Sequence, residues 1–290
     1  MITNEPSTHQ TPLPTEPAGF PEQRPPEPLQ PTWRPEADSW SVRVLHLLIG
    51  FLTWFGSVLL LVFVPAIIAV PYLVYRWKTG GLPSGEALLT DKTLVLISIL
   101  GIVPTHLLTL GLVWLIVTQG GKQPFWKTIG FAWPETVGPV VGTLACIGTA
   151  VLLLVIGFGV THFWGGGKTQ LDLLVESSLA ARFATAFVAV FTAPLVEELV
   201  YRGVLYSAVE RALGKIVAVG VVSLLFAGVH VFQYSNNIAV ITVITLLSVT
   251  LTLVRAYSGR VLPAFVIHFV FNGIQSLLIV LAPFVGDLSS

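Results

Sequence analysis

The stretch VLHLLIGFLTWFGSVLLLVFVPAIIAVPYLVY, residues 44–75, decides the class of fold because it contains no Asp, Glu, Lys or Arg. A helix that crosses a bilayer needs about 20 apolar residues. In lipid, backbone polar groups must find partners inside the protein, so such a run is expected to be helical. Further charge-free runs occupy 93–121, 136–167, 183–196, 216–254 and 261–286. The sequence therefore predicts an all-α, polytopic membrane helical bundle.

The number of spans follows from the length of each run. The run 216–254 is too long for one helix, and its polar break at 233–237 divides it in two. The run 183–196 is too short to cross a bilayer unless its helix continues to about residue 209. An eighth helix has room in 121–135 or 165–180, so we expect seven to eight transmembrane helices. The seven spans lie near 47–75, 93–118, 139–160, 183–209, 216–232, 238–254 and 261–283.

Composition excludes several classes of protein. Of the 290 residues, 54% are hydrophobic and 10% are charged, whereas soluble domains carry roughly 25% charged residues. The net charge is zero, and without a basic face no nucleic-acid partner is expected. The single cysteine, Cys146, forms neither an internal disulfide nor a thiolate metal cluster. The bilayer itself is the first partner that the composition predicts.

Residues 1–43 differ from everything that follows. The first 40 hold 10 of the 20 prolines and six acidic residues, and such a segment has little to bury and cannot form long helices. We expect a disordered, proline-rich acidic tail over 1–43, followed by N-terminal transmembrane helices over 44–165. Lys and Arg in the tail and alternate loops outnumber those on the other side by nine to five. By the positive-inside rule, the N-terminus is expected in the cytoplasm.

Charged residues stand where an apolar span is expected. The stretch Val196–Gly203 contains three charged residues, Glu197, Glu198 and Arg202. A charged residue at the centre of a membrane helix raises the free energy of insertion by roughly 2.5–3.5 kcal/mol. Glu198 and Arg202 have the i,i+4 spacing, with the acid first, that favours an ion pair. Glu197 is rotated by about 100° and needs another partner or water. The competing interpretation is an ordinary solvated helix end at the membrane surface.

Polar residues in two later spans favour the functional interpretation. His230 lies in the fifth span, while His268 and Asn272 share one face of the seventh. Glu197, His230 and His268 each lie 13 to 15 residues from a span boundary, which is roughly 20 Å of helix. They can therefore meet near mid-depth. His106, in the second span, has no acidic neighbour in sequence and is interpreted as a packing donor.

One acid, two histidines and one amide at a common depth suit hydrolysis. Glu197 can take a proton from water, and His230 can share that water or deliver a proton to the leaving amine. His268 and Asn272 can donate hydrogen bonds to a developing oxyanion.

These residues resemble the CPBP intramembrane proteases, the family of CAAX prenyl protease type 2 and bacteriocin-processing enzymes. Its motifs EExxxR, FxxxH and HxxxN match Glu197–Arg202, Phe226–His230 and His268–Asn272, in that order. The resemblance implies a catalytic membrane core over 177–285. It also implies an endopeptidase that cuts membrane-bound peptides or proteins, prenylated CAAX-type proteins among them. The family's roles make Glu197, His230, His268 and Asn272 catalytic, and Glu198, Arg202 and Phe226 supporting.

Metal dependence and two other classes of function stay open at this point. His230, His268 and a glutamate could hold a catalytic zinc and leave one position for water. An amide beside His268 suits an oxyanion hole better, so no cofactor is favoured. A proton-coupled transporter would use the same residues as a relay, although matched halves are not evident. A non-catalytic immunity or scaffold protein would keep the fold without the reaction.

Overall fold

The computed structural model describes residues 39–81, 85, 88, 91–234 and 237–286. The chain divides into two units, 1–34 and 35–290, and every described residue belongs to the second. The described residues are all-helical, without strands, as predicted. The disorder predicted for the tail lies outside them, apart from its end, where the first helix begins at Trp40.

Among the described residues, three long apolar helical segments precede the helices that carry the three motifs. Ser39 caps the first of them by accepting a hydrogen bond from the backbone N–H of Val42. Two shorter helices meet at Gly101 and together form one apolar segment, Lys92–Val117. The bounds are α1 Trp40–Gly80, α3 Lys92–Leu100, α4 Ile102–Val117, α5 Phe125–Thr128 and α6 Pro139–Trp164.

The helices of the motif region form a continuous segment, Leu179–Leu213, followed by three separate helices. This segment is interrupted twice by π-helical geometry, at η1 and at η2. Its bounds are α8 Leu179–Phe187, η1 Val188–Thr192, α9 Ala193–Glu198, η2 Leu199–Leu205 and α10 Tyr206–Leu213, preceded by α7 Gln170–Ser177. The last helices are α11 Lys215–Tyr234, α12 Ile238–Ser258 and α13 Leu262–Gly286.

Six of the described helical segments are long and apolar enough to cross a membrane. They correspond to six of the seven predicted spans. The remaining one, the predicted fifth span, is the shorter apolar helix Lys215–Val231 in α11. The two regions with room for an eighth helix contain only the short α5 and α7. Many large apolar side chains are exposed, as expected for surfaces that face lipid. The fold is that of a multi-pass integral membrane protein, and its orientation stays a prediction.

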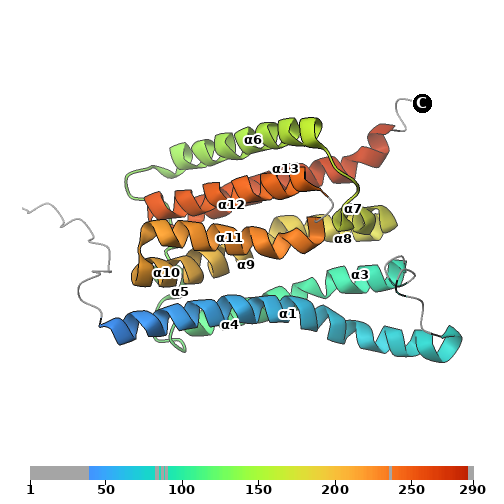
Figure 1. The fold of residues 1–290 in the computed structure, drawn as a ribbon, viewed down its shortest axis with the longest axis horizontal. Helices are drawn as coiled ribbons and strands as arrows, with labels where there is room; N and C mark the ends of the chain where they lie inside the picture. Colours follow the sequence, from blue (N-terminus) through green and yellow to red (C-terminus); the bar gives the residue numbers. More distant parts are fainter. Residues whose placement is uncertain (1–38, 82–84, 86–87, 89–90, 235–236, 287–290) are drawn as a thin grey trace, which may run out of the picture. The chain divides into compact units, whose positions relative to one another are not determined.

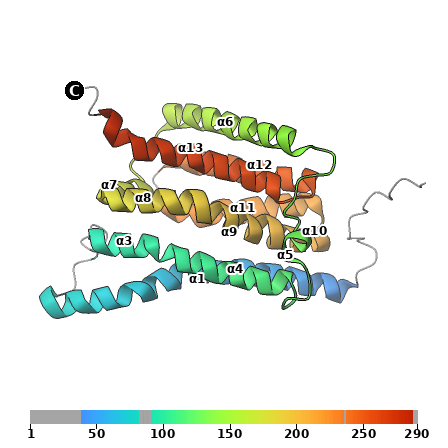
Figure 2. The ribbon, with the colours of Figure 1, turned by 180° about the vertical axis from the view of Figure 1, so that it is seen from behind.

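The helices that carry the motifs lie between α1, α3 and α4 on one side and α6 on the other (Figures 1 and 2). Helices α1 and α4 pack together on one side, and α6 packs against α12 and α13 on the other. Gly50 of α1 explains one close approach, because a Cβ there would lie 2.5 Å from the Cβ of Ala208 in α10. Glycine at this position lets α1 lie directly against the segment that carries the EExxxR motif.

Candidate active site

The EExxxR motif lies where the backbone departs from regular α-helix. The N–H of Ala193 donates to the carbonyl of Val188, and that of Tyr206 donates to Tyr201, both five residues back. Such π-helical turns are rare and are frequent at functional sites. Pro194 adds a second irregularity because it has no N–H to donate. The helix therefore leaves backbone groups here for side chains to satisfy.

Glu198 and Arg202 form the predicted ion pair. Arg202 Nη1 donates to Glu198 Oε1 at 2.9 Å, and both side chains are fully buried. Arg202 also donates to Ser248 through Nη2, at 3.1 Å to both its carbonyl and its hydroxyl, and to Thr252 Oγ1 at 3.3 Å. Its guanidinium lies 4.6 Å from the ring centroid of Phe226. A buried charge is tolerated when it is paired and hydrogen-bonded in this way, and the supporting role predicted for this pair stays a prediction.

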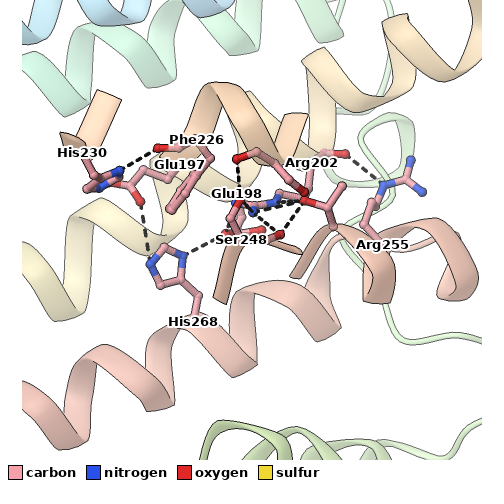
Figure 3. A network of polar contacts seen from close by, with 10 residues as sticks. Glu197, Glu198, Arg202, Phe226, His230, Ser248, Arg255 and His268 are labelled. Carbon is pink, nitrogen blue, oxygen red and sulfur yellow. Dashed lines mark hydrogen bonds and ion pairs between the residues drawn. The ribbon is translucent and has the colours of Figure 1, made fainter. Parts of the chain in front are cut away.

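His268 supplies the partner that Glu197 lacked in sequence. Its Nδ1 lies 2.9 Å from Glu198 Oε1, and its Nε2 lies 3.7 Å from Glu197 Oε2. Figure 3 shows the resulting chain of polar contacts from Glu197 through His268 and Glu198 to Arg202. The Glu197 side chain is 26% exposed, whereas the Glu198 side chain is fully buried. Of the two adjacent carboxylates, only Glu197 can therefore meet water.

The partners of His268 fix where its protons lie. Glu198 is ion-paired with Arg202, and an ionised carboxylate can only accept hydrogen bonds. In its contact with Glu198, His268 Nδ1 is therefore the donor and carries the hydrogen. Neutral His268 then has its lone pair on Nε2, toward Glu197. It can donate to an oxyanion from Nε2 only after it gains a second proton. This condition modifies the role that the sequence predicted for His268.

His230 has the corresponding arrangement on α11. Its Nδ1 donates to the carbonyl of Phe226 at 2.8 Å, which leaves a lone pair on Nε2. The Phe226 ring lies 4.8 Å from the His230 ring and 5.9 Å from that of His268, centroid to centroid. Phe226 therefore separates and orients the two histidines.

Asn272, one helical turn after His268 on α13, contacts the π-helical turn η1. Its Nδ2 donates to the carbonyl oxygen of Ala189 at 2.9 Å. With the five-residue spacing of η1, the N–H that would reach Ala189 is that of residue 194, which is proline. Asn272 therefore satisfies a carbonyl that the helix cannot satisfy, and one of its two amide hydrogens is already engaged.

Two residues that the sequence did not assign to the site lie near Glu197. His106 of α4 donates from Nδ1 to Thr192 Oγ1 at 2.8 Å, as a packing donor would. It also lies within electrostatic range of Glu197, an acidic residue that is distant in sequence. At the end of α11, burial and then the Glu197 carboxylate raise the pKa of Tyr234 to about 12. No local pattern could have revealed either neighbour, because each comes from a different helix.

The arrangement of side chains does not form a ready metal site. Within the described residues, no group of three or more His, Cys, Asp or Glu side chains is placed to hold a metal ion. His230, His268 and a glutamate, which are the zinc ligands considered from the sequence, do not converge as a ligand set here. Metal independence stays a prediction.

The family comparison agrees with the motifs. Residues 179–274 match the family model described as Type II CAAX prenyl endopeptidase, Rce1-like. The matched segment contains all three motifs and every residue of the candidate site except His106. The resemblance seen in the sequence is thereby confirmed, and this part of the chain is a Rce1-like, CPBP-family domain. No curated protein and no solved structure gives a match.

Proposed function

We propose that this protein is an intramembrane endopeptidase that hydrolyses a peptide bond of a membrane-associated substrate, with prenylated CAAX-type proteins as the first substrate class to test. The family match supports peptidase chemistry. The observation that carries the proposal is the pair of adjacent carboxylates with opposite environments. Glu198 is fully buried on Arg202, and Glu197 is open to water beside His268.

Glu197 is the general base in this proposal. Water approaches the partly exposed carboxylate, gives it a proton and attacks the carbonyl carbon of the scissile bond. The proton then passes to the amide nitrogen, the C–N bond breaks, and a carboxylate and an amine leave. His230 supports the transfer because its Nε2 lone pair can accept a hydrogen bond from the water or carry the proton onward.

His268 and Asn272 are the proposed electrostatic partners of the transition state. Protonated His268 donates from Nε2, while Glu198 holds its Nδ1 and fixes the ring. Asn272 has a second amide hydrogen beyond the one that binds Ala189. Each donor of this kind contributes about 10²–10³ in rate. Glu198, Arg202 and Phe226 keep these groups in place and do not react.

The test is peptidase activity of the purified protein in proteoliposomes on a farnesylated CAAX peptide, beside the same peptide without the lipid. Glu197→Gln should abolish turnover with an unchanged melting temperature, because an amide cannot accept the proton. Glu176→Gln, the same change at an exposed carboxylate that pairs with Lys168, is the matched control and should remain active. Full turnover by folded Glu197→Gln would contradict the assignment. A folded wild type that cleaves neither peptide would favour the transporter or scaffold alternatives.

A further inference from the structure

The donors that the sequence assigned to the oxyanion are partly engaged in the structure. Asn272 Nδ2 binds the carbonyl of Ala189, and His268 Nδ1 binds Glu198. His268 Nε2 becomes a donor only when the ring is protonated. A neutral donor close to Glu197, with its hydrogen still available, would complete the site.

Tyr201 has such a hydrogen. Its oxygen accepts a hydrogen bond from Nε1 of Trp54 at 3.0 Å. An indole N–H only donates, whereas a phenol both accepts and donates, so this bond leaves the hydroxyl hydrogen of Tyr201 unused. Among the described residues, this hydroxyl accepts from Trp54 and donates no hydrogen bond. Tyr201 is 5% exposed, and a buried donor without a partner calls for an explanation.

The position of Tyr201 places this hydroxyl in the catalytic cluster. It follows Glu197 by four residues on the same segment, so the two side chains share a face, and it lies within electrostatic range of Glu197. Its ring packs edge-on against Phe226, with centroids 5.0 Å apart and an interplanar angle of 74°. The same Phe226 ring contacts His230 and His268.

We propose that the Tyr201 hydroxyl donates a hydrogen bond to the substrate carbonyl oxygen as it becomes an oxyanion, and that Trp54 of α1 is the positioning residue. This inference rests on the proposed endopeptidase function. Trp54 donates to the hydroxyl oxygen and so leaves the hydroxyl hydrogen available for the substrate. A neutral donor fixed before the reaction need not reorganise when charge develops.

The proposal gives α1 a role in catalysis. Trp54 lies 147 residues before Tyr201 and outside the matched segment 179–274. The alternative is that the Trp54–Tyr201 bond merely ties α1 to η2. A tie would affect stability alone, whereas an oxyanion donor acts on charge that exists only in the transition state and therefore affects kcat.

The experiment is a double-mutant cycle of Tyr201→Phe and Trp54→Phe on the farnesylated peptide, with kcat, KM and the melting temperature measured for each variant. Tyr201→Phe keeps the ring against Phe226 and removes only the hydroxyl. It should lower kcat by about 10- to 10³-fold with KM nearly unchanged. Trp54→Phe should lower kcat less, and the double variant should match Tyr201→Phe, because Trp54 acts only through the hydroxyl.

The outcomes distinguish failure of the Tyr201 proposal from failure of the endopeptidase proposal. Wild-type kcat in Tyr201→Phe, with Glu197→Gln inactive, would overturn the role of Tyr201 and leave the endopeptidase proposal intact. An inactive wild type would overturn both. If Tyr201→Phe does not fold, Trp54→Phe decides: a fall in kcat at constant KM supports the proposal, and a fall in melting temperature alone overturns it.

Discussion

Asn272 on α13 donates a hydrogen bond from Nδ2 to the carbonyl oxygen of Ala189 in η1, at 2.9 Å. The two residues are 83 positions apart, and their contact is explained by a third residue, Pro194. Because proline has no N–H, the helix cannot satisfy Ala189 by itself. An amide assigned to catalysis from its motif therefore also stabilises the irregular backbone that precedes Glu197.

Asn272→Ala is expected to lower both activity and stability. Loss of an oxyanion donor should reduce kcat by about 10²–10³ with little change in KM. The unsatisfied Ala189 carbonyl should destabilise the fold by about 1–3 kcal/mol. Steady-state kinetics and thermal unfolding in detergent measure the two effects separately.

Pro194→Ala separates these two roles of Asn272. Alanine restores an N–H that can donate to Ala189 with the five-residue spacing of η1. In the double variant with Asn272→Ala, the melting temperature should recover while kcat stays low. Recovery of kcat together with stability would mean that Asn272 acts only on the backbone and touches no reacting group.

Glu198→Ala should lower the melting temperature more than Glu197→Ala does. Removal of Glu198 leaves Arg202 as a fully buried charge without its carboxylate, which typically costs about 3–5 kcal/mol. Glu197 is partly exposed, and its ion-pair contact with His268 is longer, at 3.7 Å. Thermal unfolding of both variants in one detergent checks this, and equal melting points would argue against the structural role of the pair.

Activity should survive removal of metal. The purified enzyme is expected to keep its kcat after treatment with a chelator and to contain less than one equivalent of zinc. Elemental analysis and kinetics on the same sample provide the measurement. Stoichiometric zinc that is lost together with activity, and restored with it, would instead make His230 and His268 ligands.

Deletion of residues 1–38 should leave catalysis unchanged. This truncation keeps Ser39, whose side chain caps α1. The sequence of the tail offers little to pack, and every residue assigned to the candidate site follows residue 38. Kinetics of the truncated, membrane-inserted protein test this, and a loss of kcat at normal melting temperature would reveal a role for the tail.

Local rules were sufficient for part of this molecule. The charge-free runs predicted the apolar helices because a membrane segment must satisfy its own backbone. The Glu198–Arg202 pair followed from the i,i+4 spacing because both residues lie on one helix. The three motifs predicted the family domain because each is a short pattern within one helix.

Tertiary structure alone decided how those helices share their polar groups. His268 lies 70 residues from Glu198 and lies between two carboxylates, so the position of its hydrogen depends on α13 meeting α9. Trp54 reaches Tyr201, and Asn272 reaches Ala189, only because separate helices pack together. Sequence spacing determines which side chains share a face of one helix, but hydrogen bonds between helices depend on distances that only packing sets.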